Sequence, residues 1–198
     1  HSADADGEDQ AMSVALTWEG PVGPGHFPRD PLVFDRLCEA GVYLRIKAYD
    51  GGRLVAYAGQ SVALLARFDQ HLSAMLALAT PLRDAGGAVV YSGDAGERLG
   101  AYEALPEYAA LAAADAGRVR VFYALCDEYF HTEHLNLAEG LLQRRIAERM
   151  ADVENAAAAP GRMPDDVPDI WENDFSGLDA DGRETLTRLL DDAPMTLR

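Results

Sequence analysis

The chain has 198 residues, of which 48% are hydrophobic and 25% are charged, which is typical of a globular domain with a sizeable core. No apolar run approaches the ~20 residues that a helix needs to cross a bilayer, and no signal-peptide pattern is visible. We therefore expect a cytoplasmic protein with no membrane partner. The formal net charge of -16 disfavours general nucleic-acid binding, because phosphate contacts need Lys and Arg.

The acidic residues gather at the two ends of the chain. Residues 1–12 carry a net charge of -4 and residues 151–198 carry -8, whereas the long middle stretch also carries only -4. The sequence 19–31 is rich in Pro and Gly. We expect three parts: a disordered or loop segment at 1–31, a folded domain at 32–155 and an acidic extension at 156–198.

The first clear elements form a hairpin. Apolar and polar side chains alternate along residues 41–49, which predicts a β-strand. Asp50, Gly51 and Gly52 form a turn sequence, and residues 54–58 predict a second strand that pairs with the first. Ser61 is a candidate N-cap for a helix that runs to about residue 78.

Further elements follow in alternation. We expect a short strand at 88–91, a helix at 103–114 around a proline, a strand at 119–125 and a helix at 133–150. A last short helix is expected at 183–192, either capped by Asp181 or preceded by a turn at Gly182. This order predicts an α/β fold with a small mixed β-sheet flanked by helices. The only cysteines, Cys38 and Cys126, lie in apolar stretches, which predicts buried free thiols.

Residues whose side chains could take part in catalysis lie on the hairpin and in the segments after it. Gly41-Val42-Tyr43 lies on the first strand and Tyr57-Ala58-Gly59 on the second, followed by Arg67, His71 and later Glu139. The order resembles the GIY-YIG nuclease superfamily over roughly residues 40–150. Each tripeptide alone is a weak signal, but the two tripeptides in this order, followed by Arg67, make a more specific one. The four-residue step from Arg67 to His71 is similar to the restriction-enzyme branch.

The resemblance implies a metal-dependent endonuclease that hydrolyses phosphodiester bonds in DNA. By resemblance, Glu139 binds Mg²⁺ or Mn²⁺, ions that one carboxylate and several waters can hold. Arg67 would hold the phosphate and stabilise the developing charge. Glu133 competes with Glu139 for the metal role, and Asn155 is a candidate for the family's late asparagine.

The tyrosines and the histidine would orient the attacking water and accept or relay its proton. By resemblance, Tyr43 acts as general base, and Tyr57 and His71 orient water or relay the proton, with Gln60 as possible support. Arg67 and His71 lie four residues apart and therefore on one helix face. A tyrosine has an ordinary pKa of about 10. Tyr43 could act as a base only if Arg67 and the metal lowered that value.

A second hypothesis stays open. The net charge of -16 favours a GIY-YIG-like domain that does not cut nucleic acid and acts through a protein partner or on a small-molecule substrate. The acidic extension could fold back and compete with DNA for Arg67, Arg144 and Arg145, or it could be a solvated tail. Trp171 and Phe175 favour docking, because a disordered tail is usually poor in aromatic residues.

Overall fold

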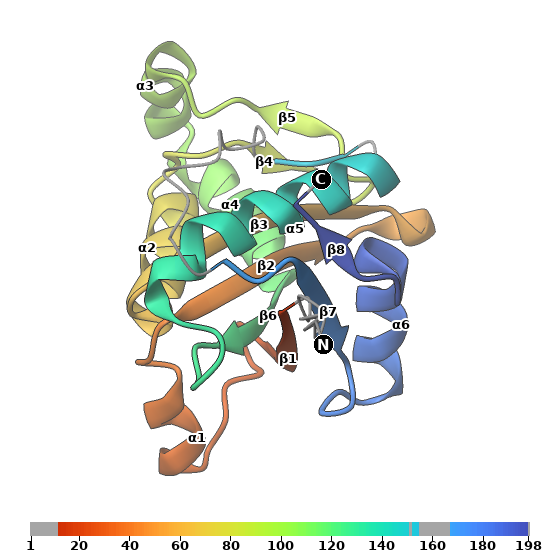
Figure 1. Cartoon of the computed structure of the whole chain (residues 1–198). Coiled ribbons are helices and arrows are strands. Elements are labelled where there is room, and N and C mark those ends of the chain that lie inside the picture. Colours follow the sequence, from red (N-terminus) through yellow and green to blue (C-terminus); the bar gives the residue numbers. More distant parts are fainter. Residues whose placement is uncertain (1–11, 151, 155–166, 198) are drawn as a thin grey trace, which may run out of the picture.

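A computed structural model describes residues 12–150, 152–154 and 167–197. These residues form a mixed α/β structure around a six-stranded sheet of order β3-β2-β6-β1-β7-β8 (Figure 1). Its strands are β1 (Ser13–Val22), β2 (Gly41–Ala48), β3 (Leu54–Ser61), β6 (Val119–Leu125), β7 (Ile170–Asp174) and β8 (Met195–Thr196). A separate two-stranded sheet pairs β4 (Leu82–Arg83) with β5 (Val89–Tyr91). The helices are α1 (Pro31–Arg36), α2 (Leu64–Leu76), α3 (Ala95–Glu103), α4 (Leu105–Gly117), α5 (Leu135–Arg149) and α6 (Ala180–Leu190).

The sheet combines the predicted hairpin with strands from both ends of the chain. β2 and β3 pair antiparallel around the turn at Asp50–Gly52, which confirms the hairpin. β6 pairs antiparallel with the other side of β2, as expected for a strand at 119–125. β1 then lies between β6, to which it runs antiparallel, and β7, to which it runs parallel. The sheet is therefore mixed.

Helices cover both faces of the sheet (Figure 1). Val42, Leu44 and Ile46 of β2 belong to the larger core cluster, to which α5 and α6 contribute. Tyr43 points to the opposite face, where α2 and α4 supply the second cluster. The alternation read from residues 41–49 thus separates the two cores, because successive side chains of a strand point to opposite faces.

Both chain ends enter the core: this differs from the loop expected at the N-terminal end and agrees with the docking that Trp171 and Phe175 indicated at the C-terminal end. Ser13–Val22 is a strand inside the sheet, with Leu16 and Trp18 fully buried. The Pro and Gly of residues 19–31 obscured this alternation, so the loop expectation for residues 13–22 was wrong. Of the expected extension 156–198, the described part supplies β7 and α6, which pack into the larger core. Residues 1–11 and 156–166 lie outside the described residues.

Several local expectations also need correction. Ser61 ends β3, and its hydroxyl bonds the backbone of Ala63, so α2 begins only at residue 64. Asp179, rather than Asp181, caps α6 by accepting from the backbone of Gly182. The helix expected at 103–114 is the end of α3 followed by α4.

The cysteines are more accessible than expected: Cys38 is exposed and Cys126 is half-buried. No helix in the described part of the chain is long and apolar enough to span a membrane.

Candidate functional site

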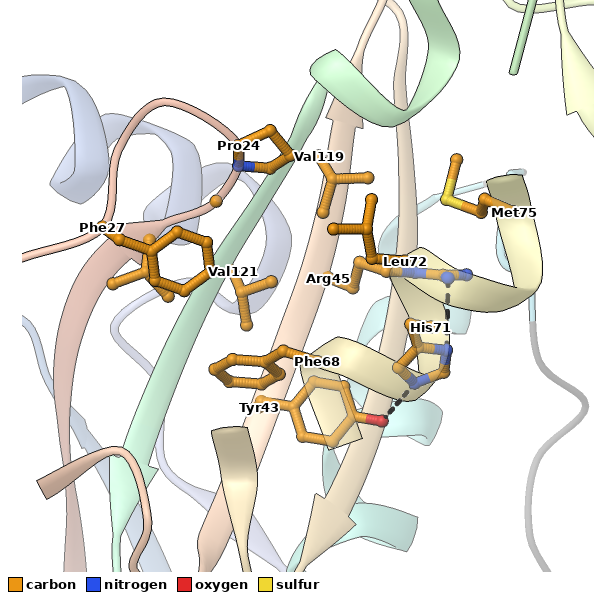
Figure 2. Close-up of a pocket in the computed structure, with 12 residues that line it drawn as sticks. Pro24, Phe27, Tyr43, Arg45, Phe68, His71, Leu72, Met75, Val119 and Val121 are labelled. Atoms are coloured by element: carbon orange, nitrogen blue, oxygen red, sulfur yellow. Dashed lines mark hydrogen bonds between the residues drawn. The ribbon is translucent and has the colours of Figure 1, made fainter. Parts of the chain in front are cut away.

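Four of the predicted site residues meet on the sheet face covered by α2. The Tyr43 hydroxyl oxygen lies 2.7 Å from Nε2 of His71 and 3.4 Å from Nε of Arg67. Tyr57 stacks on Tyr43 with a ring-centroid distance of 6.1 Å and packs edge-on against His71 at 5.2 Å. Residues that lie on three separate elements thus form one contiguous cluster, which Figure 2 shows in part.

Local structure explains this convergence. Tyr43 and Tyr57 lie on paired strands, with Tyr43 opposite Gly59 and Tyr57 opposite Arg45. Arg67 and His71 lie one turn apart on α2, on the side that faces the sheet. Phe68 of the same helix anchors α2 over β2, because its ring packs edge-on against Tyr43 at 5.5 Å.

Arg45 belongs to this cluster, although the sequence reading did not select it. Its NH1 group lies 3.3 Å from Nδ1 of His71, and its guanidinium lies 5.0 Å from the ring centroid of Tyr57. Its NH2 group donates to the carboxylate of Glu154. The available signal was the strand period, because Arg45 follows Tyr43 by two residues and therefore shares its face.

Burial decides the protonation of Tyr43. The side chain has 0% of its surface exposed. Burial raises the pKa of the Tyr43 phenol well above its ordinary value, and the hydrogen bond from Arg67 opposes this shift only in part. Arg67 by itself therefore does not meet the condition set for a Tyr43 base, because the net shift of the pKa is upward. Tyr43 is a neutral phenol at neutral pH.

His71 is also neutral. Burial lowers the pKa of its imidazole to about 4, and the positive charges of Arg45 and Arg67 act in the same direction. An uncharged imidazole has one N–H donor and one acceptor nitrogen. Its hydrogen-bond partners therefore determine which nitrogen carries the proton.

Glu139 lies on α5, a helix that packs against β3 on the sheet face opposite to Tyr43, and of the cluster residues Arg67 is the one whose charge reaches it. Gln143, one turn later, donates to the backbone carbonyl of Ala58 and fixes this contact. Glu139 is half-buried; burial raises its pKa, while the charge of Arg67 lowers it. Glu139 makes no hydrogen bond or ion pair with any residue that the structure describes. Its carboxylate is thus an available oxygen ligand close to Arg67.

The remaining predicted residues do not join the cluster. Gln60 donates to the side chain of Asn136 on α5, on the other side of the sheet from Tyr43. Glu133 is exposed in the short 3-10 helix Thr132–His134. Asn155 lies outside the described residues. Within the described ranges, no three His, Cys, Asp or Glu side chains are grouped to hold a metal, so a metal site would depend on Glu139 with water and substrate oxygens.

A narrow apolar pocket adjoins the cluster (Figure 2). It lies between α2, β6 and the loop after β1, and its lining includes Phe27, Leu72, Met75 and Val121. Tyr43, Arg45 and His71 form its wall toward the cluster. Its free volume of about 30 Å³ is enough for one or two waters but too small for a nucleobase. A group larger than water could therefore reach the cluster only at its part-exposed surface.

Comparisons of the chain with protein-family models, with curated proteins and with solved structures each gave no match.

Proposed function

We propose that this chain is a metal-dependent endonuclease that hydrolyses phosphodiester bonds in DNA, in the manner of GIY-YIG enzymes. The supporting observation is the hydrogen-bonded cluster of Tyr43, Arg67 and His71, with Tyr57 stacked on it. Groups of this kind serve to bind and stabilise a phosphate in transfer reactions.

Arg67 is the proposed phosphate ligand. Its guanidinium is held at two points, by the Tyr43 oxygen at 3.4 Å and by the Gln70 side chain at 3.0 Å, yet the residue remains part-exposed. A fixed, planar cation loses little entropy when it binds phosphate oxygens. Arg67 can therefore stabilise charge that develops on the phosphoryl oxygens.

Glu139 is the proposed metal ligand. A half-buried carboxylate with free oxygens fits Mg²⁺ or Mn²⁺, which are commonly held by one or two carboxylates together with water and phosphate. When bound, such an ion supplies positive charge that makes water more nucleophilic and offsets charge on the leaving oxygen.

The burial of Tyr43 changes its proposed role. A general base must contact the water that it deprotonates, and Tyr43 has no exposed surface and a raised pKa. In our proposal Tyr43 holds Arg67 and His71 in place. Tyr57, which keeps part of its surface exposed, orients the attacking water.

A second candidate is a related domain that does not cut nucleic acid and acts through a protein partner or on a small substrate. Two observations favour it: the net charge of -16, which repels phosphate, and the enclosure of Tyr43. A DNA-binding measurement separates the two candidates directly.

The test is cleavage of duplex DNA by the purified chain with Mg²⁺ or Mn²⁺. We expect Arg67→Ala to lower the rate by ~10²–10³, as for other donors to a developing charge. Arg67→Lys should recover little, because Lys lacks the planar fork. Arg98→Ala, at a part-exposed arginine of α3, is the matched control and should cut normally. Full activity of Arg67→Ala would refute the assignment, and absence of both binding and cleavage by the wild type would favour the second candidate.

A further inference from the structure

Arg45 lies where it can determine which ring nitrogen of His71 carries the proton. The residue is 8% exposed and lies on β2, beneath the helix that carries His71. Its NH1 group faces Nδ1 of His71 at 3.3 Å, on the side of the ring opposite to Tyr43. Figure 2 shows the imidazole between the Tyr43 oxygen and the Arg45 guanidinium, with an interaction on each side.

The chemistry of arginine restricts the tautomer of His71. A guanidinium has five N–H donors, no acceptor, and never loses its proton in proteins. Nδ1 of His71 must therefore accept the hydrogen bond from Arg45, and the single ring proton must lie on Nε2. The other tautomer would point Nδ1–H at the N–H of Arg45, leaving two donors face to face in a buried place, where an unmade hydrogen bond is costly.

We infer that Arg45 is a positioning residue that holds His71 as the neutral Nε2–H tautomer, so that His71 and Arg67 both donate to the oxygen of Tyr43. The 2.7 Å contact is then a donation from His71 to Tyr43. The Tyr43 hydrogen is left without an acceptor among the described residues, which costs less than an N–H of His71 aimed at the cationic Arg45. Two N–H donors on one phenol oxygen stabilise negative charge there.

This arrangement argues against the proton relay that the family resemblance implied. An Nε2 that already carries a hydrogen cannot accept the proton of Tyr43. His71 instead acts together with Arg67 as a donor, and the tyrosine oxygen is the acceptor that fixes the direction of the Arg67 side chain. Only the consequence for cleavage rests on the proposed function; the tautomer itself does not.

Glu154 holds Arg45 in this position. Its carboxylate accepts from NH2 of Arg45 and also lies 3.6 Å from Nζ of Lys47 and 3.6 Å from Nε of Arg83. Lys47 is in turn paired with the buried Asp115 at 2.8 Å. The ion-pair network leaves Arg45 little freedom to turn away from His71, because a charge buried this deeply is costly to leave unpaired.

The decisive measurement is nitrogen NMR of the His71 ring in the full-length ¹⁵N-labelled protein at neutral pH, with signals assigned by their loss in His71→Gln. We expect a pyrrole-type Nε2, which carries hydrogen, and a pyridine-type Nδ1, which does not. A protonated Nδ1, in either the other tautomer or an imidazolium, would overturn the inference. Through-bond correlation of the ring nitrogens with the assigned His71 backbone gives the same assignment in the wild type, so the result does not depend on any variant folding.

Variants then test the role of Arg45. Arg45→Met keeps the stem and removes every donor, so the Nδ1–H form should become populated; an unchanged His71 spectrum in the folded variant would overturn the role of Arg45. Arg45→Lys should restore the Nε2–H form in part, because its ammonium is also a donor. Arg36→Met, which removes an exposed arginine paired with Glu19, is the control and should leave the spectrum unchanged.

A cleavage assay of the same variants separates this inference from the proposed function. Arg45→Met should lower the turnover number by roughly tenfold or more with little change in KM, because the substrate does not touch Arg45. If the wild type shows the Nε2–H form but cuts no DNA, the proposed nuclease function is refuted and the tautomer assignment remains valid. If the wild type shows the Nδ1–H form but does cut DNA, only the tautomer assignment is refuted.

Discussion

The ring of Tyr43 lies directly over Gly59, its partner across the β2–β3 hairpin. A Cβ atom at position 59 would lie 2.5 Å from the Tyr43 oxygen and 2.6 Å from the ring carbon that bears it. Real Cβ atoms essentially never approach this closely. The glycine of the second tripeptide is therefore required by the tyrosine of the first, a physical reason for the two to occur together.

Gly59→Ala should displace Tyr43 and disturb its contacts with His71 and Arg67. We expect a loss of stability of ~1–3 kcal/mol, typical of overpacking, measured by denaturant unfolding. Combining Gly59→Ala with Tyr43→Ala should remove most of the penalty, which a double-mutant cycle would detect. Gly100→Ala, in α3 with no atom near the added Cβ, is the control and should be neutral or slightly stabilising. Equal effects at positions 59 and 100 would contradict the steric argument.

Glu139→Gln should abolish metal-dependent cleavage while leaving the fold intact, because it keeps the shape of the side chain and removes its charge. The measurement pairs the cleavage rate with the shift of Tm on addition of Mg²⁺ or Mn²⁺. Glu133→Gln, at an exposed residue near the start of α5, should behave as wild type. If wild type and Glu139→Gln show the same metal-induced shift of Tm, Glu139 is not the ligand.

His71 should make stability fall in mild acid. Its folded pKa of about 4 lies below the ordinary value of about 6.5. The unfolded chain therefore binds a proton that the folded chain excludes, and stability present above pH ~6.5 is lost as the pH falls toward 4. Burial and the charges of Arg45 on β2 and Arg67 on α2 cause the shift, and the neutral hydroxyl of Tyr43 cannot offset them.

The measurement is Tm at several pH values between 7.5 and 4.5. His71→Gln should lose less Tm over this range than the wild type. His26→Gln, at an exposed histidine in the loop after β1, should follow the wild type. Parallel curves for wild type and His71→Gln would show that His71 titrates normally.

Trp171→Ala should destabilise the whole domain. Trp171 is 0% exposed on β7, packs edge-on against Phe130 at 5.9 Å and donates to the carbonyl of Pro168. Truncation of such a residue costs about 3–5 kcal/mol, which denaturant unfolding would measure. Phe34→Ala, at a 39% exposed residue of α1, is the control and should have a small effect.

Deleting residues 160–198 should likewise unfold the chain, because β7 is the parallel partner of β1 and α6 packs on α5. Asp191, on the turn after α6, pairs with Arg145 and Arg149 of α5, whereas no described residue of this segment forms an ion pair with Arg67. The expected release of an autoinhibitory tail would require the truncated protein to stay folded and bind DNA more tightly. Circular dichroism of the truncated protein reports whether it stays folded, and its DNA affinity reports whether binding tightens.

The sequence by itself determined the hairpin and the faces of the strand and helix on which four residues of the cluster lie. Alternation along residues 41–49 placed Tyr43 and Arg45 on one face, and a four-residue step placed Arg67 and His71 on one side of a helix. These features depend on contacts between near neighbours, and the period of two or 3.6 residues encodes them directly. Glu139, the proposed metal ligand, was selected only through the family resemblance.

Only the tertiary structure decided the rest. The parallel pairing of β1 with β7 joins Ser13 to Ile170, and no local pattern marks two distant stretches as partners. The same holds for Glu154, which meets Arg45 from more than a hundred residues away. Burial of Tyr43, the shifted pKa of His71 and the tautomer of its ring follow from what surrounds each group, because desolvation and donor geometry exist only after the chain has packed.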